Sequence, residues 1–328
     1  MKRWIVGQDR RRTRSAIAAT VATVALLVVG VDSAWAGNPT TSRVDDDSVE
    51  QFCPPFARFR GSNFPHPTRI DSDWYPLVPG TQLSYQGRVT VGANALPHTV
   101  VFTVTDLVKV IDGIPTRVLW DVDSTAGEVV EAELAFFAQD KRENVWTVGE
   151  YPEQYENGTF TGAPNTWITG QDDAKAGVLV PGHPRLKTPR FRQGIAPEID
   201  FLDCAQVFAM GQKTCESGIC YENVLVMDEN SPLDPSGGHQ RKFYAPEVGV
   251  VRISAVDDPQ AETLVLTSVV HLDRAALAQA RAAALKLDRH GYQVSKVYRS
   301  TPPAFQECSR AVSRYGDHIR PCSLGAAL

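Results

Sequence analysis

The stretch HTVVFTVTDLVKVIDGIPTRVLWDVD, residues 98–123, decides the fold class. Apolar and β-branched residues alternate with polar ones over 98–110 and again over 116–123, as they do in half-buried strands. The pair Asp112-Gly113 between these two runs is a signal for a two-residue hairpin turn. We therefore predict two antiparallel strands that lie side by side.

The same pattern continues on both sides of this hairpin. Turn residues at 92–94, 126–127 and 140–141 separate further runs of alternating residues. The predicted strands are 83–91, 98–110, 116–123, 129–138, 144–149, 199–208, 221–227, 240–244, 250–256 and 263–272. Because no helix stands between them, a parallel βαβ sheet is excluded. The predicted fold class is all-β, mainly an antiparallel meander that forms a curved sheet or a barrel.

A single helix is predicted near the C-terminus. Residues 274–289 are rich in Ala and Leu, Asp273 can cap their start, and Gly291 can end the helix in a left-handed turn. Its apolar stripe is narrow, so we expect it to pack on the outside of the sheet. Residues 273–328 are thus a helix followed by a disulfide-linked tail.

Residues 1–36 have the three parts of a signal peptide. Six basic residues precede an apolar run at 16–31, and Ala34-Trp35-Ala36 supplies the small residues of a cleavage site. An uncleaved N-terminal anchor is the alternative interpretation. No Cys stands at the cleavage point, so we predict a secreted or extracytoplasmic protein without a stable membrane anchor.

The remaining boundaries follow from composition. Residues 37–75 are polar and proline-rich and are predicted to be extended, and residues 76–272 form the β domain. Within that domain, 150–197 is rich in Gly, Pro and aromatic residues, and we predict a long loop over the concave face. After cleavage the net charge is near −9, a surface that repels phosphate backbones, so nucleic acid is not an expected partner. The oligomeric state is left open.

All six cysteines lie in the mature part, where an even count indicates disulfides. Proximity in sequence favours Cys215 with Cys220 and Cys308 with Cys322. Cys53 with Cys204 follows by elimination. Zinc sites need paired Cys or interleaved His, and neither pattern occurs, so we predict no metal and no cofactor.

The stretch 150–197 and the strand before it also carry the candidate site. Carboxylates held among aromatic rings can take different pKa values, so that one can act as a general acid and another as a general base. The predicted catalytic residues are Glu150 or Glu156 as general base, with His183 or Arg192 as electrostatic partner. The alternative is that these acidic residues have only a structural role, in a solvated loop that pairs with the basic residues after it. The predicted ligand-binding residues are Trp146, Tyr151, Tyr155, Trp167 and Arg192.

Several short motifs between residues 75 and 272 resemble those of a group of exported bacterial β-rich proteins without an assigned activity. They include YPLVPGT at 75–81, YENG at 155–158, PGHP at 181–184 and YAPEVGVV at 244–251. The last is similar to a strand-turn-strand of lipoprotein-carrier half-barrels, in which a curved sheet encloses an apolar ligand. The chain departs from the group at Cys215 and Cys220, which replace a Pro-Gly turn, and from Asp273 onward. The resemblance implies the fold and the compartment.

These observations lead to one preferred function and two alternatives. We expect a barrel or half-barrel that binds an apolar or amphipathic small molecule beneath the 150–197 loop. One alternative is a cofactor-independent hydrolase, lyase or isomerase that uses the loop carboxylates. The other is a structural module associated with the cell wall.

Overall fold

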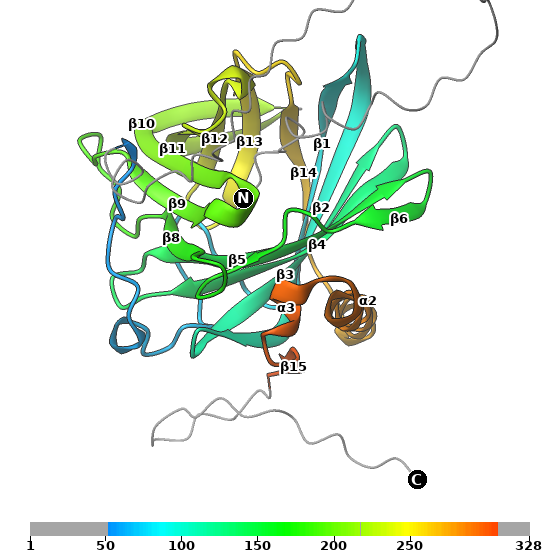
Figure 1. The fold of residues 1–328 in the computed structure, drawn as a ribbon. Coiled ribbons are helices and arrows are strands. Elements are labelled where there is room, and N and C mark those ends of the chain that lie inside the picture. Colours follow the sequence, from blue (N-terminus) through cyan, green and yellow to red (C-terminus); the bar gives the residue numbers. More distant parts are fainter. Residues whose placement is uncertain (1–51, 217, 308–328) are drawn as a thin grey trace, which may run out of the picture.

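Twelve antiparallel strands close into a barrel in this computed structural model, which describes residues 52–216 and 218–307 (Figure 1). The order around the barrel is β1-β14-β13-β12-β11-β10-β9-β8-β5-β4-β3-β2, and β1 pairs with β2 to complete the circle. The predicted all-β antiparallel fold is confirmed, and of the predicted forms it is the barrel. The predicted signal peptide, residues 1–36, and residues 37–51 lie outside the described residues.

Each of the ten predicted strands corresponds to one strand of the barrel. The barrel strands are β1 Thr81–Val91, β2 Asn94–Ile111, β3 Ile114–Thr125, β4 Glu128–Gln139, β5 Val145–Glu156, β8 Lys175–Val180, β9 Phe191–Ala196, β10 Phe201–Glu216, β11 Ile219–Asn230, β12 His239–Ala245, β13 Gly249–Val256 and β14 Thr263–His271. Three short strands complete the sheet: β6 Thr159–Gly162, β7 Trp167–Ile168 and β15 Phe305–Gln306. The helical elements are α2 Arg274–Val294, α3 Lys296–Arg299 and the 3-10 turns η2 Gly61–Asn63, η3 Pro197–Ile199 and η4 Pro235–Gly237.

Two-residue turns fix the register of the longest strands. Both residues of Asp112-Gly113 have positive φ, 47° and 74°, and so do those of Ala126-Gly127, at 53° and 87°. Positive φ at both central positions is the type I′ geometry, whose twist matches that of the flanking strands. The predicted β2–β3 and β3–β4 hairpins are therefore confirmed.

Residues 150–197 differ from the predicted loop, because most of them belong to the barrel wall. β5 runs on to Glu156, and β6, β7, β8 and β9 follow within the stretch. Nearly every residue of β8 and β9 is buried. Residues 54–64 cover their outer side: Arg192 N donates to Pro54 O at 3.0 Å, and the rings of Phe56 and Phe191 are 5.1 Å apart. A strand buried on both faces shows no alternation in its sequence.

The N-terminal segment is attached to the barrel by the predicted disulfide between Cys53 and Cys204. The predicted pair of Cys215 and Cys220 is also present, across the β10–β11 turn. Cys308 and Cys322 lie outside the described residues. Two disulfides suit a protein of an oxidising, extracytoplasmic compartment.

α2 packs on the outer surface of the barrel over β2 and β4, as predicted (Figure 1). Ala276 N donates to Asp273 Oδ1 at 2.8 Å, so the predicted N-cap is confirmed. The predicted end at Gly291 is wrong, since the helix continues to Val294. A β-carbon at Gly291 would lie 2.6 Å from Tyr298 Cδ1 and 3.1 Å from Tyr151 Cε1. Glycine is therefore needed there for close packing and not for a turn.

Gly291→Ala is expected to lower the free energy of unfolding by about 1–3 kcal/mol, as overpacking does. The loss should appear although alanine is the better helix former by about 1 kcal/mol. Tyr298 cannot move aside, because its ring lies 4.4 Å from that of Tyr151 and its hydroxyl donates to Asp288 Oδ1 at 2.6 Å. Urea denaturation measures the change, with exposed Gln293→Ala as control. A more stable Gly291→Ala protein would contradict this prediction and show that the rings of Tyr298 and Tyr151 can shift to make room for the methyl group.

Candidate functional site

The candidate residues of β5 lie on both faces of the strand. Trp146 Nε1 donates to Asp140 Oδ2 at 3.0 Å beneath the N-terminal segment. Glu150 accepts a hydrogen bond from Trp167 Nε1 at 3.1 Å, while its neighbour Tyr151 lies beneath α2. Successive residues of a strand point to opposite faces. Glu150 and Tyr151 therefore do not share one cavity.

The other predicted site residues are spread more widely. Glu156 is exposed at the β5–β6 hairpin, and the side chain of His183 is 74% exposed, 3.7 Å from Glu143 Oε2. Arg192 is buried in β9, on a strand that the N-terminal segment covers. The structure thus does not bring Glu150, Glu156 and His183 together, and we propose no catalytic site from them.

Tyr151 and Tyr155 have a partner in Glu153, which is 1% exposed. Both hydroxyls donate to its carboxylate, Tyr155 at 2.5 Å, and His290 Nδ1 of α2 lies 2.6 Å from Oε1. Burial raises the pKa of both tyrosines well above the ordinary value, and the hydrogen bonds to Glu153 raise it further. These side chains join β5 to α2.

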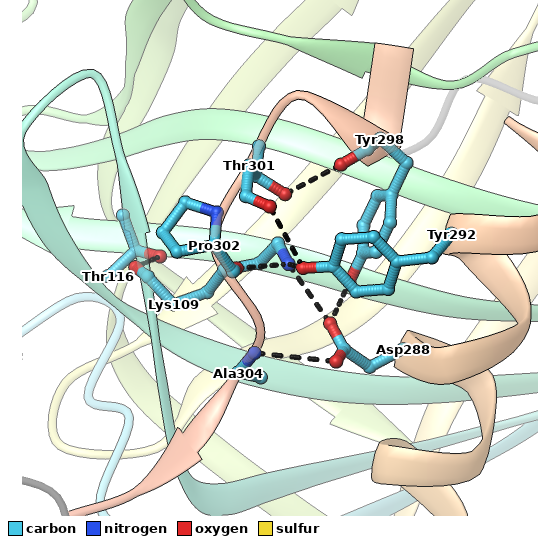
Figure 2. Close-up of polar contacts among 8 residues, drawn as sticks. All are labelled: Lys109, Thr116, Asp288, Tyr292, Tyr298, Thr301, Pro302 and Ala304. Carbon is cyan, nitrogen blue, oxygen red and sulfur yellow. Dashed lines mark hydrogen bonds and ion pairs between the residues drawn. The ribbon is translucent and has the colours of Figure 1, made fainter. Parts of the chain in front are cut away.

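A second buried cluster anchors α2 and the segment after it, as Figure 2 shows. Lys109 Nζ on β2 donates to Asp288 Oδ1 at 3.0 Å, to Tyr292 Oη at 2.9 Å and to the carbonyl of Pro302 at 3.0 Å. Its ammonium also lies 4.1 Å from the ring centre of Tyr298. The side chain is fully buried, and this desolvation lowers the pKa of Lys109 to about 8 despite the pairing with Asp288.

The barrel interior holds its own buried ion pair. Lys242 Nζ lies 2.5 Å from Glu229 Oε2, and Gln193 Nε2 and Tyr244 Oη donate to Glu229 Oε1 at 3.1 and 3.2 Å. Burial, together with the charge of Glu229, raises the pKa of Tyr244 well above its ordinary value, so this hydroxyl stays a donor. The cluster joins β9, β11 and β12 across the interior.

An opening in the barrel wall lies between β13 and β14. The two strands pair from Arg252 with Val265 to Ser254 with Thr263. Beyond that point, Gly249 and Val250 pair with β12, and Leu266 and residues 268–271 pair with β1. In the described part of the chain no ladder joins these two sets of residues to each other. We call this opening the seam. Strand edges without a ladder partner are places where other groups can bind.

Tyr85 closes the seam from inside. Its hydroxyl donates to the carbonyl of Val250 at 2.8 Å, so a side chain of β1 reaches β13 past the intervening β14. The side chain is 2% exposed, and burial raises the pKa of this hydroxyl well above its ordinary value. Its ring also packs edge-on against Phe102, with the ring centres 5.2 Å apart, so Tyr85 joins β1, β2 and β13 at this point.

An apolar crevice lies directly beneath the seam. It measures about 10 Å³, room for roughly one water molecule. Its walls are mostly apolar or aromatic side chains, from β1, β2, β3, β13 and the segment that enters the barrel before β1. The lining residues are Tyr75, Pro76, Leu77, Leu83, Tyr85, Phe102, Leu119, Val248, Gly249 and Val250.

Val269 lies at the mouth of the seam. It pairs in register with Leu83, so the two side chains are on the same face of the sheet. Leu83 is buried, whereas Val269 is 47% exposed because β13 has moved away from β14 at this point. Val270, next along the strand, is 41% exposed on the opposite face. Val269 is therefore an exposed apolar side chain on the same face of the sheet as Leu83, which lines the crevice.

Sequence reasoning missed the seam and the buried charges. Asp121 pairs in register with Glu133 and Asp123 with Glu131, and all four carboxylates are buried. The available signal was the alternation of acids with apolar residues at 121–123 and 131–133. No signal in the sequence marked the divergence of β13 from β14.

Two further properties concern the described residues alone. Within 52–216 and 218–307, no group of three or more His, Cys, Asp or Glu side chains is arranged to hold a metal ion. In the same part of the chain, no helix has both the length and the apolar character needed to cross a membrane.

Comparison with known proteins found no matching family model and no matching curated relative. Two solved structures are similar. One is a protein from Bacteroides fragilis with a YmcC-like fold, thought to be exported, at 13% identity and a TM-score of 0.32. The other, from Parabacteroides distasonis, is thought to be a lipoprotein, at 13% identity and a TM-score of 0.28. Each match covers 61% of this chain and 99% of the other.

Proposed function

We propose that the protein binds an amphipathic small molecule outside the cytoplasm and takes its apolar part into the barrel through the seam. The observation that carries this proposal is the opening between β13 and β14 above an apolar crevice. A barrel of eight strands is just wide enough to be filled by its own side chains, and a barrel of twelve is wider. Part of the interior of this barrel is filled by side chains of the stretch before β1, which lies outside the barrel strands.

That segment supports entry of a ligand. Tyr75 and Leu77 line the crevice but belong to the stretch before β1, which is joined to the β12–β13 turn by a single backbone bond, from Glu247 N to Asp73 O at 2.7 Å. In this proposal the stretch moves aside while the barrel strands stay paired with one another. Displacing Leu77 and breaking the bond from Tyr85 to Val250 would enlarge the crevice from its closed volume.

The polar end of the ligand would stay at the mouth of the seam. Thr81 Oγ1 and His271 Nδ1 lie 3.4 Å apart at the ends of β1 and β14, close to the solvent. Both can exchange hydrogen bonds with a polar head group. An apolar interior with polar groups at its entrance is the usual form of a small-molecule site.

The test compares two neighbouring valines of β14. The purified exported chain is titrated with N-phenyl-1-naphthylamine, whose fluorescence rises in apolar surroundings, and then with dodecanoate as competitor. Val269→Asp places a charge on the apolar path and is expected to weaken probe binding at least tenfold. Val270→Asp, the control on the opposite face, should change it less than twofold. A wild-type chain that binds neither compound, or equal losses in both variants, would contradict the proposal and favour a structural module.

A further inference from the structure

Basic side chains from three separate segments gather at one end of the barrel. Lys141 N donates to Asn63 O at 2.8 Å, which places the β4–β5 turn beside the N-terminal segment (Figure 1, blue). Gly182 N donates to Asn144 Oδ1 at 3.0 Å, which places the β8–β9 connection against the same turn. We call this region the basic end. Its exposed cations are Arg58, Arg60, Lys141, Arg142, Arg185 and Lys187.

Little negative charge opposes these cations. None of the six forms an ion pair with an acid in the part of the chain that the structure describes. Two exposed carboxylates lie nearby: Glu143 is 3.7 Å from His183 Nε2, and Asp112 belongs to the β2–β3 turn, whose next residue Ile114 lies beside Gly61. The full chain nevertheless carries a net charge of −5. Six exposed cations without an ion-pair partner among the described residues therefore lie at this end of a protein whose overall charge is negative.

Large apolar side chains are exposed among the same cations. Leu186 lies between Arg185 and Lys187 and is 61% exposed, and Phe52 is 59% exposed. Phe56, 37% exposed, packs its ring against Phe191 at the edge of the basic end. Apolar tips surrounded by Lys and Arg are the pattern of surfaces that lie in a membrane interface.

We propose that the basic end docks the protein reversibly on an anionic lipid surface. Lys and Arg would pair with the head groups, each strengthening binding roughly fivefold, and Leu186 and Phe52 would enter the region between head groups and acyl chains. The path of the chain agrees with this orientation. The described residues begin at Phe52, next to Cys53 and the segment that carries Arg58 and Arg60, and 15 residues lie between Phe52 and the predicted signal peptide. Charge alone would suit a soluble polyanion equally well, but exposed apolar tips favour a lipid.

Vesicle sedimentation tests this proposal with the purified exported chain. The vesicles are phosphatidylcholine with 30% phosphatidylglycerol, and phosphatidylcholine alone is the uncharged reference. We expect binding to the anionic vesicles alone, weakened at high salt by screening. Arg185→Gln/Lys187→Gln should weaken it by about tenfold or more, and Leu186→Ser should weaken it severalfold. All these positions are exposed, so the variants should keep the wild-type midpoint of thermal unfolding.

The matched control removes the same charge elsewhere. Arg274 and Lys286 are exposed on α2, away from the basic end. Arg274→Gln/Lys286→Gln should leave vesicle binding within a factor of about two. Equal losses in the two double variants would overturn the proposal, because binding would then follow net charge. Failure of the wild type to bind anionic vesicles at low salt would also overturn it. So would an unchanged affinity of Leu186→Ser together with equal binding of soluble heparin, which would indicate polyanion recognition without lipid insertion.

Discussion

Replacing both Cys53 and Cys204 with serine is expected to lower the free energy of unfolding by about 5 kcal/mol. The two residues are 151 positions apart, and a cross-link stabilises mainly by restricting the unfolded chain, more so for a longer loop. The bond also holds residues 54–64 against the barrel, where Arg192 N of β9 donates to Pro54 O and Phe59 packs on Trp146 of β5 at 5.4 Å. Urea denaturation under oxidising conditions measures the loss.

The second disulfide is the natural control for this experiment. Cys215 and Cys220 are only 5 positions apart, so the same chain-entropy argument gives about 2 kcal/mol for Cys215→Ser/Cys220→Ser. The prediction is therefore a difference of about 3 kcal/mol between the two double variants. Equal losses would mean that loop length does not govern the effect and that contacts in the native protein do.

The sequence was informative where one face of a strand is buried and the other is not. β1, β2 and β3 alternate, and Asp112-Gly113 and Ala126-Gly127 supply the turn geometry, so this half of the barrel was predictable. β8 and β9 are buried on both faces because a segment more than 100 residues earlier covers them. Their periodicity is lost for a tertiary reason that no local pattern records.

The same limit applies to the candidate site. Glu150 and Tyr151 are adjacent in sequence and looked like one pocket, but the pleat of β5 sends them to opposite faces. Tyr85 and Val250 are 165 positions apart and meet only because β13 leaves β14. Lys109 is one of the polar positions in the alternating run at 98–110. It is buried because α2 folds back over β2 from the far end of the chain.

Lys109→Met is expected to lower the free energy of unfolding by about 3–5 kcal/mol at pH 7. The change leaves Asp288 buried without its cation, and breaking a buried ion pair costs about that much. Asp288 would keep the hydroxyl of Tyr298 and the amide of Ala304, at 2.6 and 3.3 Å. Asp288→Asn should cost a similar amount, and the double variant Lys109→Met/Asp288→Asn less than the sum of the two. Exposed Lys286→Met, in the same helix, should change stability by less than about 0.5 kcal/mol.

The pH dependence separates this ion pair from simple packing. The folded protein releases the Lys109 proton near pH 8, whereas an unfolded lysine holds it to about 10.4. Between these values the unfolded chain binds more protons, so the stability of the wild type rises with pH over this window.

Lys109→Met lacks the titrating lysine, so its stability should not show that rise. Tyr292, whose pKa burial raises to about 12, and the other buried tyrosines are common to both proteins and cancel in the difference. Urea denaturation at pH 7.5 and 9.5 measures the difference in the free energy of unfolding between the wild type and Lys109→Met. This difference should be larger at pH 9.5. A constant difference would show that Lys109 keeps an ordinary pKa beneath α2.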